Sequence, residues 1–502
     1  MSTTPAAKGD VDHVTWALFY EPSTINWTQA YAVAENTTLA NMCESLLRQE
    51  PDFSIKPGLA ESVENPTPLK WVYRIRSGVR FWDGKPMTAD DVVYSLKTTM
   101  GPTSYWAGWF GNVRSVERSG PDEVTVTLKR PDSIFNKMMA TAGGVVVERA
   151  YAEEKGATYG TPDGGVMCTG PFKFQSWNKG ASIVMTRNDD YWNPAGRAHA
   201  RTLELRFVPD ESTLTSALLS GDIDGTFSAP LSGVSQLRGA SDGTLTLGTS
   251  TTTDLIAFSA SSGPLADPRV RRALSLAIDR TAIAKTVFSD TAQPVKASAA
   301  PSTWGYAKDA FSKAYDALPD TSKPDLAAAK QLMAQAGKPS RSVTLAFSGD
   351  VATFVQIATI IQDAAKQIGL PMKLKPIPTT AFVALFNDAK AREGVDGVLG
   401  FWYPDTAEPL NIYSQILGVQ NFNGYKDPTA LAAQDAALAT YNDDKRAQHV
   451  IALQKQLVQD MPWLPLVNRS ELLFMNNRIT GASASSLMEL YAPWAAGIGA
   501  AG

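Results

Sequence analysis

The sequence predicts an α/β protein with at least two domains. The chain has 502 residues, more than one hydrophobic core usually organises, so two or three domains are expected. Hydrophobic residues make up 44% and charged residues 19% of the chain, which is ordinary for a globular protein. Patterns typical of β-hairpins alternate with amphipathic helices in the first half, and the second half repeats strand, helix, strand.

The first half is predicted to be rich in strands, because its apolar residues often recur at every second position. A helix over residues 89–99 is favoured by Thr88, which lies three residues before the carboxylate of Asp91 as in a capping box. Two further helices are predicted over residues 32–47 and 211–219. Strands are predicted over residues 11–20, 71–76, 79–81, 123–128, 172–177, 183–187 and 203–208.

The second half is predicted to alternate helices with strands. One long helix is expected over residues 267–285, with Pro268 in its first turn. Two others are stopped by Gly337 and Gly369. The predicted helices are 267–285, 325–336, 354–368 and 444–459, and the predicted strands are 343–347, 372–376, 463–467 and 472–475.

Composition and motifs favour a binding protein over a catalyst. The net charge of −4 forms no basic stripe, so nucleic acid is not an expected partner. His13, His199 and His449 are isolated from one another, which predicts no metal site. Residues 239–243 spell G-x-S-x-G but lack the strand and helix that a nucleophile elbow needs. We therefore expect no catalytic residue, no metal and no cofactor.

Two features leave alternatives open. Cys43 and Cys168 are the two cysteines, and they fit either two buried thiols or one disulfide. No stretch approaches the ~18 apolar residues that span a bilayer. Residues 1–10 read as a polar linker, which fits a cytoplasmic protein or an exported one whose signal has been removed.

A loop rich in aromatic and proline residues is the best candidate for a ligand site. Trp402, Tyr403, Pro404 and Asp405 follow an apolar segment, and Glu408 and Pro409 come shortly after. A strand ending in a rigid loop with aromatic rings and an anion suits a cationic or amphipathic ligand. The alternative is a surface loop whose aromatic side chains are tucked inward.

Five motifs in order resemble the peptide/nickel (family 5) extracellular solute-binding proteins of ABC importers. The longest, WVYRIRSGVRFWDGKPMTADDV, covers residues 71–92. The others are TGPF, RNDDYW, SGDID and DPRVRRALSLAIDR, at residues 169–172, 187–192, 220–224 and 267–280.

The resemblance implies a two-lobe, periplasmic-binding-protein-like fold of type II, cluster C, whose lobes close on a ligand. Lobe I would comprise residues 1–50, 166–250 and 471–502, with an extra subdomain over residues 51–165. Lobe II would comprise residues 251–470. The chain would cross between the lobes near residues 250–258 and 465–475.

The resemblance also implies an extracellular or periplasmic location. The protein would be a lipid-anchored monomer that passes its ligand to the permease subunits of an ABC importer. Residue 1 would then follow a removed signal and a lipid-bearing cysteine. An oxidising compartment favours a disulfide between Cys43 and Cys168.

Residue roles are implied in the same way. Asp405 matches the aspartate that pairs with a peptide α-ammonium, beside Trp402, Tyr403 and Pro404. Tyr31, Ala32 and Val33 match a segment that pairs with the peptide main chain as an added strand. Ser348 replaces the arginine of dipeptide binders, which argues against a strict dipeptide site. The chief alternative ligand is an oligosaccharide or another small metabolite, with sugar-stacking platforms at Trp106, Trp109, Trp304 and Trp402.

Overall fold

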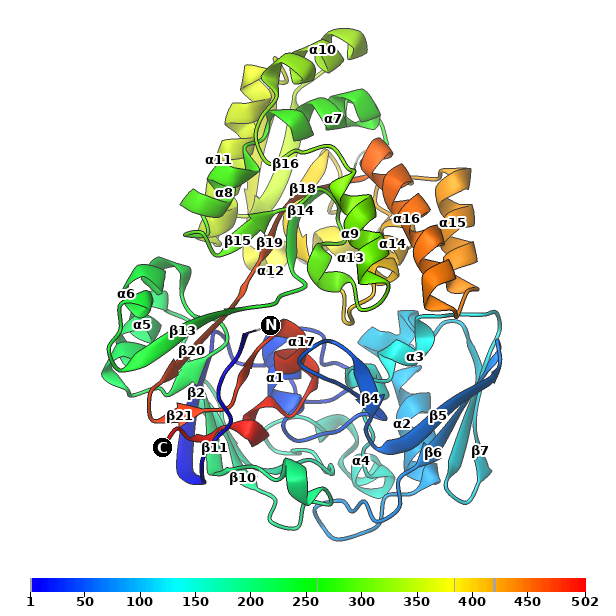
Figure 1. The fold of residues 1–502 in the computed structure, drawn as a ribbon, viewed down its shortest axis with the longest axis vertical. Helices are drawn as coiled ribbons and strands as arrows, with labels where there is room; N and C mark the ends of the chain where they lie inside the picture. Colours follow the sequence, from blue (N-terminus) through cyan, green and yellow to red (C-terminus); the bar gives the residue numbers. More distant parts are fainter. Residues whose placement is uncertain (1, 260, 383, 419–420) are drawn as a thin grey trace. The chain divides into compact units, whose positions relative to one another are not determined.

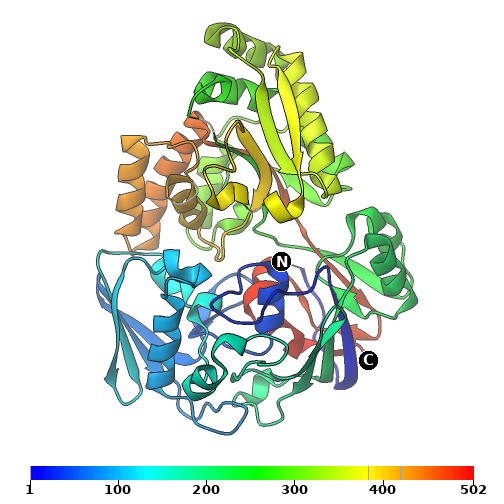
Figure 2. The same cartoon turned by 180° about the vertical axis from the view of Figure 1, so that it is seen from behind.

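The computed structural model describes residues 2–259, 261–382, 384–418 and 421–502, and the chain divides into two compact units (Figures 1 and 2). Unit 1 comprises Met1–Thr249 and Glu471–Gly502, and unit 2 comprises Ser250–Ser470. Both ends of the chain therefore belong to unit 1, and two chain segments connect the units.

A seven-stranded mixed sheet forms the centre of unit 1, in the order β13-β20-β12-β2-β11-β10-β9. The central strand β2 runs parallel to β11 and β12, and the other neighbours in the sheet are antiparallel. The fully buried ring of Trp16 in β2 packs on Phe227 and Trp494. The strands are β2 (Val11–Leu18), β9 (Phe172–Asn178), β10 (Ser182–Arg187), β11 (Ala200–Phe207), β12 (Gly225–Thr226), β13 (Gly243–Gly248) and β20 (Glu471–Asn476).

Helices and a smaller sheet complete unit 1. α1 (Val33–Leu39) packs against α17 (Ser486–Tyr491). The smaller antiparallel sheet has the order β5-β6-β8-β7, and α2 (Ala89–Thr99) packs on it. The capping box of Thr88 and Asp91 forms as predicted. Other elements are β3 (Leu47–Gln49), β4 (Ile55–Pro57), β5 (Ala60–Thr67), β6 (Lys70–Ile75), β7 (Val113–Gly120), β8 (Glu123–Leu128), α3 (Phe135–Met138), α4 (Arg149–Lys155), α5 (Glu211–Ser220) and α6 (Val234–Arg238).

Unit 2 is built on a six-stranded sheet in the order β15-β19-β14-β18-β16-β17. β16 runs parallel to both of its neighbours, and the long helix α11 packs on β16, β17 and β18. The antiparallel part of the sheet includes β14 and β19, the strands closest in sequence to the two connections with unit 1. The strands are β14 (Thr253–Phe258), β15 (Ala292–Pro294), β16 (Val343–Ser348), β17 (Met372–Ile377), β18 (Gly397–Trp402) and β19 (Trp463–Arg469).

The helices of unit 2 gather in two groups, one with α7, α10 and α11 and one with α9, α14, α15 and α16 (Figure 1). Their bounds are α7 (Pro268–Ala277), α8 (Arg280–Thr286), α9 (Lys308–Asp316), α10 (Leu326–Ala336), α11 (Ala352–Gln367), α12 (Thr379–Phe382), α13 (Ala384–Asn387), α14 (Pro409–Leu417), α15 (Pro428–Leu438) and α16 (Asp443–Asp460).

Three predicted elements differ from the structure. The helix predicted over residues 32–47 ends at Leu39, because the backbone carbonyls of Asn41 and Met42 accept hydrogen bonds from the segment around Gly170. The helix predicted over 267–285 is two helices, because Ile278 is extended and Asp279 caps α8. Residues 79–81 form no strand, and Arg80 makes only an isolated bridge.

Candidate ligand-binding site

The loop that contains Asp405 joins β18 directly to α14 in unit 2. β18 is held on one side by β14 and on the other by β16, so the loop begins from a fixed strand. Glu408 is the N-cap of α14, and Pro409 occupies its first turn. The five residues between Trp402 and Glu408 are therefore fixed at both ends.

A buried charged cluster anchors the end of this loop. The carboxylate of Glu408 is fully buried and accepts hydrogen bonds from the Tyr306 hydroxyl at 2.9 Å and from the Leu410 backbone N–H at 3.2 Å. Arg446 lies 3.5 Å from Glu408, and its guanidinium stacks 4.1 Å from the centre of the Tyr306 ring. Burial acts to lower the pKa of Arg446, but the charge of Glu408 raises it above its ordinary value. The sequence had suggested Glu408 only as a second loop carboxylate; the structure gives it an anchoring role.

The middle of the loop is held by its backbone. The carbonyl of Pro404, a buried residue, accepts a hydrogen bond from the Thr251 hydroxyl at 3.3 Å. The Gly305 N–H donates to the Ala407 carbonyl at 3.1 Å, and a Cβ at Gly305 would lie 2.3 Å from that oxygen. Only glycine therefore permits this approach. The structure thus brings Trp304, predicted separately, alongside the Asp405 loop.

Aromatic rings surround the start of the loop. The half-buried Trp402 packs against Trp463, with ring centres 5.8 Å apart. Tyr403 stacks on Phe401 at 6.4 Å, and Phe401 is 40% exposed. Asp405 itself is half-buried. Asp405 thus follows closely in the chain on residues whose rings pack against neighbouring aromatic side chains.

The three residues predicted to pair with a peptide main chain lie in unit 1. Ala32 has an extended backbone, but Val33 is already the first residue of α1, so these residues do not form a strand. Tyr31 is 44% exposed, and its ring stacks on Tyr105 at 4.9 Å. Strand-like pairing is thus limited to the two residues before the helix, and Tyr31 adds an aromatic face that sequence reasoning had not assigned.

The predicted tryptophan platforms for sugar rings are not equivalent. Trp106 is fully buried, and its Nε1 donates a hydrogen bond to the Trp27 carbonyl at 3.1 Å. Its prediction as a stacking platform is therefore wrong, because no face of the ring is accessible. Trp304 is 9% exposed, while Trp109 and Trp402 are half-buried.

Two of the sequence motifs meet at the carboxylate of Glu44, a half-buried residue of unit 1. Glu44 accepts hydrogen bonds from the Thr169 hydroxyl at 2.7 Å, the Tyr191 hydroxyl at 2.7 Å and the Trp192 Nε1 at 2.8 Å. Burial raises the pKa of Glu44. These motif residues hold the scaffold together, and sequence reasoning missed Glu44 because its partners lie more than 100 residues away.

Next to Glu44, Cys43 and Cys168 form a disulfide. Cys43 lies in the turn after α1 rather than on the helix as predicted. The Cys168 carbonyl accepts a hydrogen bond from the backbone N–H of Trp82, and Gly170 donates to the Met42 carbonyl. The disulfide therefore connects the segment after α1 to the segment around Cys168. The hydrogen bond between Glu44 and Thr169 connects the same two segments.

The arginines of the motif at residues 267–280 also have structural roles. Arg280 is 1% exposed and donates to the carbonyls of Pro465 at 3.0 Å and Ser275 at 2.8 Å. Burial lowers its pKa to about 10. Because Pro465 lies in β19, Arg280 fixes a strand that leads towards unit 1.

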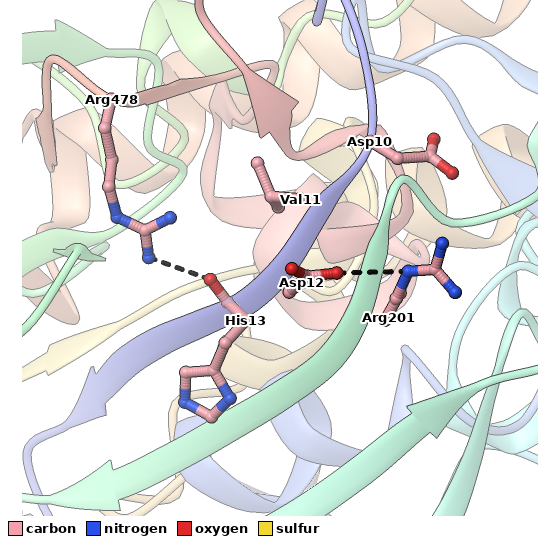
Figure 3. A pocket seen from close by; sticks show the side chains of 6 residues that line it. All are labelled: Asp10, Val11, Asp12, His13, Arg201 and Arg478. Atoms are coloured by element: carbon pink, nitrogen blue, oxygen red, sulfur yellow. Dashed lines mark hydrogen bonds and ion pairs between the residues drawn. The ribbon is translucent and has the colours of Figure 1, made fainter.

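A hollow of about 560 Å³ on unit 1 is lined by none of the residues that the sequence predicted to bind ligand (Figure 3). Figure 3 shows Asp12 and Arg201 facing each other, 3.1 Å apart, and Arg478 donating to the His13 carbonyl at 2.8 Å. Its charged groups thus already have partners on neighbouring strands. Its lining residues are Asp10, Val11, Asp12, His13, Arg201 and Arg478.

Within the described residues, no three His, Cys, Asp or Glu side chains are grouped so as to hold a metal ion. None of the helices in the described ranges is long and apolar enough to cross a membrane.

Known proteins are similar in sequence to this chain over nearly its whole length. The oligopeptide-binding protein AppA of Bacillus subtilis is 25% identical over 486 residues, which cover 91% of this chain and 86% of AppA. The glutathione-binding protein GsiB of Escherichia coli K12 is 25% identical over 475 residues, covering 92% and 89% of the two chains.

Solved structures share the fold. AppA in complex with a nonapeptide superposes with a TM-score of 0.82 at 21% identity, over 98% of this chain and 100% of AppA. AgaA of A. tumefaciens R10 in complex with agropinic acid also gives 0.82 at 21% identity, over 97% and 98%. The fold is thus the two-lobe type II fold of periplasmic binding proteins.

The family of this chain is established by its match to a model of the whole family, and not by its similarity to one relative. The model of the bacterial extracellular solute-binding proteins, family 5 Middle, matches residues 54–424. This range includes all five motifs and also the Asp405 loop. The chain belongs to the bacterial extracellular solute-binding proteins of family 5.

Proposed function

We propose that this protein captures an oligopeptide or peptide-like solute and delivers it to the membrane permease of an ABC importer, without chemistry of its own. The observation that carries the proposal is Asp405, a half-buried carboxylate on a loop fixed at both ends. A partly desolvated carboxylate in a rigid loop favours a cation, such as a peptide α-ammonium. AppA, an oligopeptide-binding protein by name, and GsiB, a glutathione-binding protein by name, support this ligand class.

The remaining ligand contacts are proposed from their position and chemistry. Trp402, Tyr403 and Pro404 would form an apolar wall beside the ammonium, and Trp304 would lie next to them in unit 2. Tyr31, Ala32 and Val33 would contribute from unit 1 when the two units close on the solute. Ser348 is 1% exposed and lies 2.6 Å from the Thr379 hydroxyl, so this position supplies no cation for the carboxylate of a short peptide.

Replacing Asp405 by Asn tests the proposal. The substitution keeps the shape of the side chain and removes its charge, so peptide affinity should fall by about 2–5 kcal/mol in calorimetry if the ammonium is desolvated. N-acetylation of the same peptide should weaken binding to the unmodified protein by a similar amount, but it should weaken binding to Asp405→Asn very little. Asp444→Asn, on the exposed start of α16, is the matched control.

Two outcomes would overturn the assignment. Equal affinity of the unmodified protein and Asp405→Asn for a confirmed peptide would exclude the ion pair. A thermal-shift screen in which oligosaccharides or other small metabolites stabilise the protein while peptides do not would favour the alternative ligand classes, since a saturating ligand raises apparent stability. AgaA, with agropinic acid bound, shows that the same fold also takes a small metabolite.

The location and assembly state are proposed as well. The family is extracellular, and we assign this member to the outer face of the cytoplasmic membrane or to the periplasm, held by a lipid anchor and acting as a monomer. Light scattering of the purified chain should give the mass of one copy with and without ligand.

A further inference from the structure

The two chain segments that connect the units leave unit 1 at one place. β13 and β20 lie side by side, and their pairing ends at Gly248 opposite Glu471 (Figure 1). β13 continues into Thr249, the last residue of unit 1 before the first connection, and β20 begins at Glu471, directly after Ser470 of unit 2. A group that contacts this end of the strand pair can therefore affect both connections.

The segment that leads into α17 holds the first connection through its backbone. The Thr249 N–H donates to the carbonyl of Ala484 in β22 (Ser483–Ala484) at 3.2 Å, and the Ser486 N–H donates to the Thr249 carbonyl at 3.1 Å. A Cβ at Gly248 would lie 2.0 Å from the Ala484 carbonyl oxygen, so this close approach requires glycine. Gly248 thus faces β22, which α17 follows in the chain.

The geometry of the sheet places the side chain of Glu471 on this same face. Residues directly opposite one another in an antiparallel pair point to the same side of the sheet, and Gly248 and Glu471 are such a pair. Leu472, the next residue of β20, points to the other side, into the core cluster that contains Leu214 of α5. The carboxyl of Glu471 therefore lies on the face of the sheet where β22 lies.

A second buried carboxyl lies on α17. Glu489 is 5% exposed and accepts a hydrogen bond from the Thr37 hydroxyl of α1 at 3.2 Å. Its backbone N–H donates to the carbonyl of Ser485, the residue that forms a β-bridge with Thr249. Burial raises the pKa of Glu489 to about 8, and burial together with the charge of Glu489 raises the pKa of Glu471. The two carboxyls are therefore close enough to repel each other when both are ionised.

Charged groups on the elements packed against α17 have other partners. Glu35 of α1 accepts hydrogen bonds from the backbone N–H and the hydroxyl of Ser23, at 2.9 and 2.8 Å. Arg48 of β3 is exposed and lies 2.7 Å from Glu50. The other ionisable residue of α17, Tyr491, packs its ring against a buried tryptophan.

The surroundings of Glu471 bring no compensating charge either. β12, β13 and β22 contain no ionisable residue. Arg469, two residues earlier in the chain, donates its hydrogen bonds of 2.7 and 2.5 Å to Asp254. Within the described residues, neither Glu471 nor Glu489 forms an ion pair. Each proton that leaves the pair therefore adds an uncompensated negative charge.

We propose that Glu471 and Glu489 form a proton-dependent lock at the connection between the two units. With a proton on the pair, the end of β20 stays against the region of α17, and both connecting segments keep their backbone pairing. When both carboxylates are ionised they repel each other. Because Glu489 is held within α17, the end of β20 at Glu471 moves away and its pairing with Gly248 opens. The connection is then stiffer in mildly acidic than in alkaline surroundings, whichever solute the protein binds.

Hydrogen exchange of the ligand-free, full-length protein tests the lock. Mass spectrometry follows exchange between pH 5 and 8 in peptides that cover residues 247–252 and 471–474, after correction for the intrinsic pH dependence of amide exchange. Opening converts a carboxyl with a pKa of about 8 into one with the ordinary value near 4.5. Opening therefore becomes more favourable as pH rises, and protection should fall by up to about ten-fold per pH unit in this window.

The double substitution Glu471→Gln with Glu489→Gln separates the lock from other effects of pH. Glutamine is neutral, as glutamic acid is when protonated, so the double variant should fold and keep its protection up to pH 8. Glu64→Gln, at an exposed position of the same unit, is the matched control and should lose protection as the unmodified protein does.

A loss of protection that is confined to the connection and absent from the double variant supports the lock. Constant protection of the unmodified protein between pH 5 and 8 overturns it, as does a pH-dependent loss that persists in the double variant. An equal loss in β10 and β11, which belong to the same sheet but not to the connection, would show that the whole of unit 1 opens and would also overturn it.

Discussion

At the scale of single residues, two glutamates of unit 1 illustrate how burial controls charge. Glu489 in α17 is 5% exposed and accepts a hydrogen bond from the Thr37 hydroxyl at 3.2 Å. Burial raises its pKa to about 8. Burial, and then the charge of Glu489, also raise the pKa of Glu471, the first residue of β20. The folded protein therefore holds protons that the unfolded chain releases at lower pH.

This proton retention predicts that unit 1 loses stability as pH rises. Between the ordinary glutamate pKa near 4.5 and the raised value of about 8, the folded state binds more protons than the unfolded state. The free energy of unfolding then falls with pH, by up to about 1.4 kcal/mol per pH unit for one such group. Glu489→Gln, which stays neutral, should flatten this dependence in urea unfolding between pH 5 and 8. The exposed Glu64→Gln should retain it, and an unchanged slope in Glu489→Gln would contradict the assignment.

At the scale of elements, the sequence predicts what is determined locally. The bounds of α2 follow from Thr88, Asp91 and the apolar spacing within the helix, and the structure matches them. The end of α1 could not be predicted, because it depends on hydrogen bonds to a segment more than 100 residues later. A capping signal is contained in one short segment of the sequence and can be recognised there. A tertiary contact that overrides a helix propensity involves a second segment far away in the sequence, so the first segment does not reveal it.

The candidate site shows the same division. Pro404 and Asp405 stand in a recognisable loop, so sequence was enough to single them out. The cluster that fixes the loop combines Tyr306, Glu408 and Arg446, which are far apart in sequence. Only one local signal pointed to it: Glu408 precedes Pro409, the order expected for a helix N-cap followed by proline in the first turn.

The disulfide is the element-scale feature with the largest predicted effect on stability. Cys43 and Cys168 are 125 residues apart, and closing a loop of this length stabilises the folded state by roughly 4–5 kcal/mol in the chain-entropy model. The double substitution Cys43→Ala with Cys168→Ala should therefore lower the unfolding midpoint of unit 1. Differential scanning calorimetry should show this transition moving down in temperature while that of unit 2 stays in place. A shift of both transitions by the same amount would show that the units do not unfold independently.

At the scale of the whole molecule, two antiparallel chain segments connect the units. In unit 1 their pairing ends at Gly248 opposite Glu471, and in unit 2 it resumes at Thr253 opposite Asn468. Between these two paired stretches the first connecting segment therefore has four positions, residues 249–252, whereas the second has two, residues 469 and 470. The Asn468 side-chain amide donates to the carbonyls of Ser250 at 3.0 Å and Thr252 at 2.7 Å. One side chain therefore holds the longer segment in shape where the chain leaves unit 2.

Next to this amide, an ion pair fixes the same strands. Asp254 in β14 is fully buried, and its carboxylate accepts two hydrogen bonds from Arg469 in β19, at 2.7 and 2.5 Å. The Arg469 guanidinium also stacks 4.9 Å from the centre of the Phe401 ring. Phe401 lies in β18, the strand that leads into the Asp405 loop. The connection and the candidate site are thus tied to the same three strands of unit 2.

Asn468→Ala tests whether this restraint contributes to binding. Removing the amide frees two carbonyls in the connecting segment, so the ligand-free protein should sample more arrangements of its two units. Binding must then order a larger ensemble, and peptide affinity should fall by about 1 kcal/mol. Calorimetry measures the affinity, and small-angle scattering should show a larger radius of gyration for the ligand-free variant only. Asn477→Ala is the control, since the Asn477 amide also donates to a backbone carbonyl, that of Ser241 at 2.9 Å within unit 1. If both variants bind peptide as tightly as the unmodified protein, the connection is not restrained by Asn468, and closure depends on the ligand contacts alone.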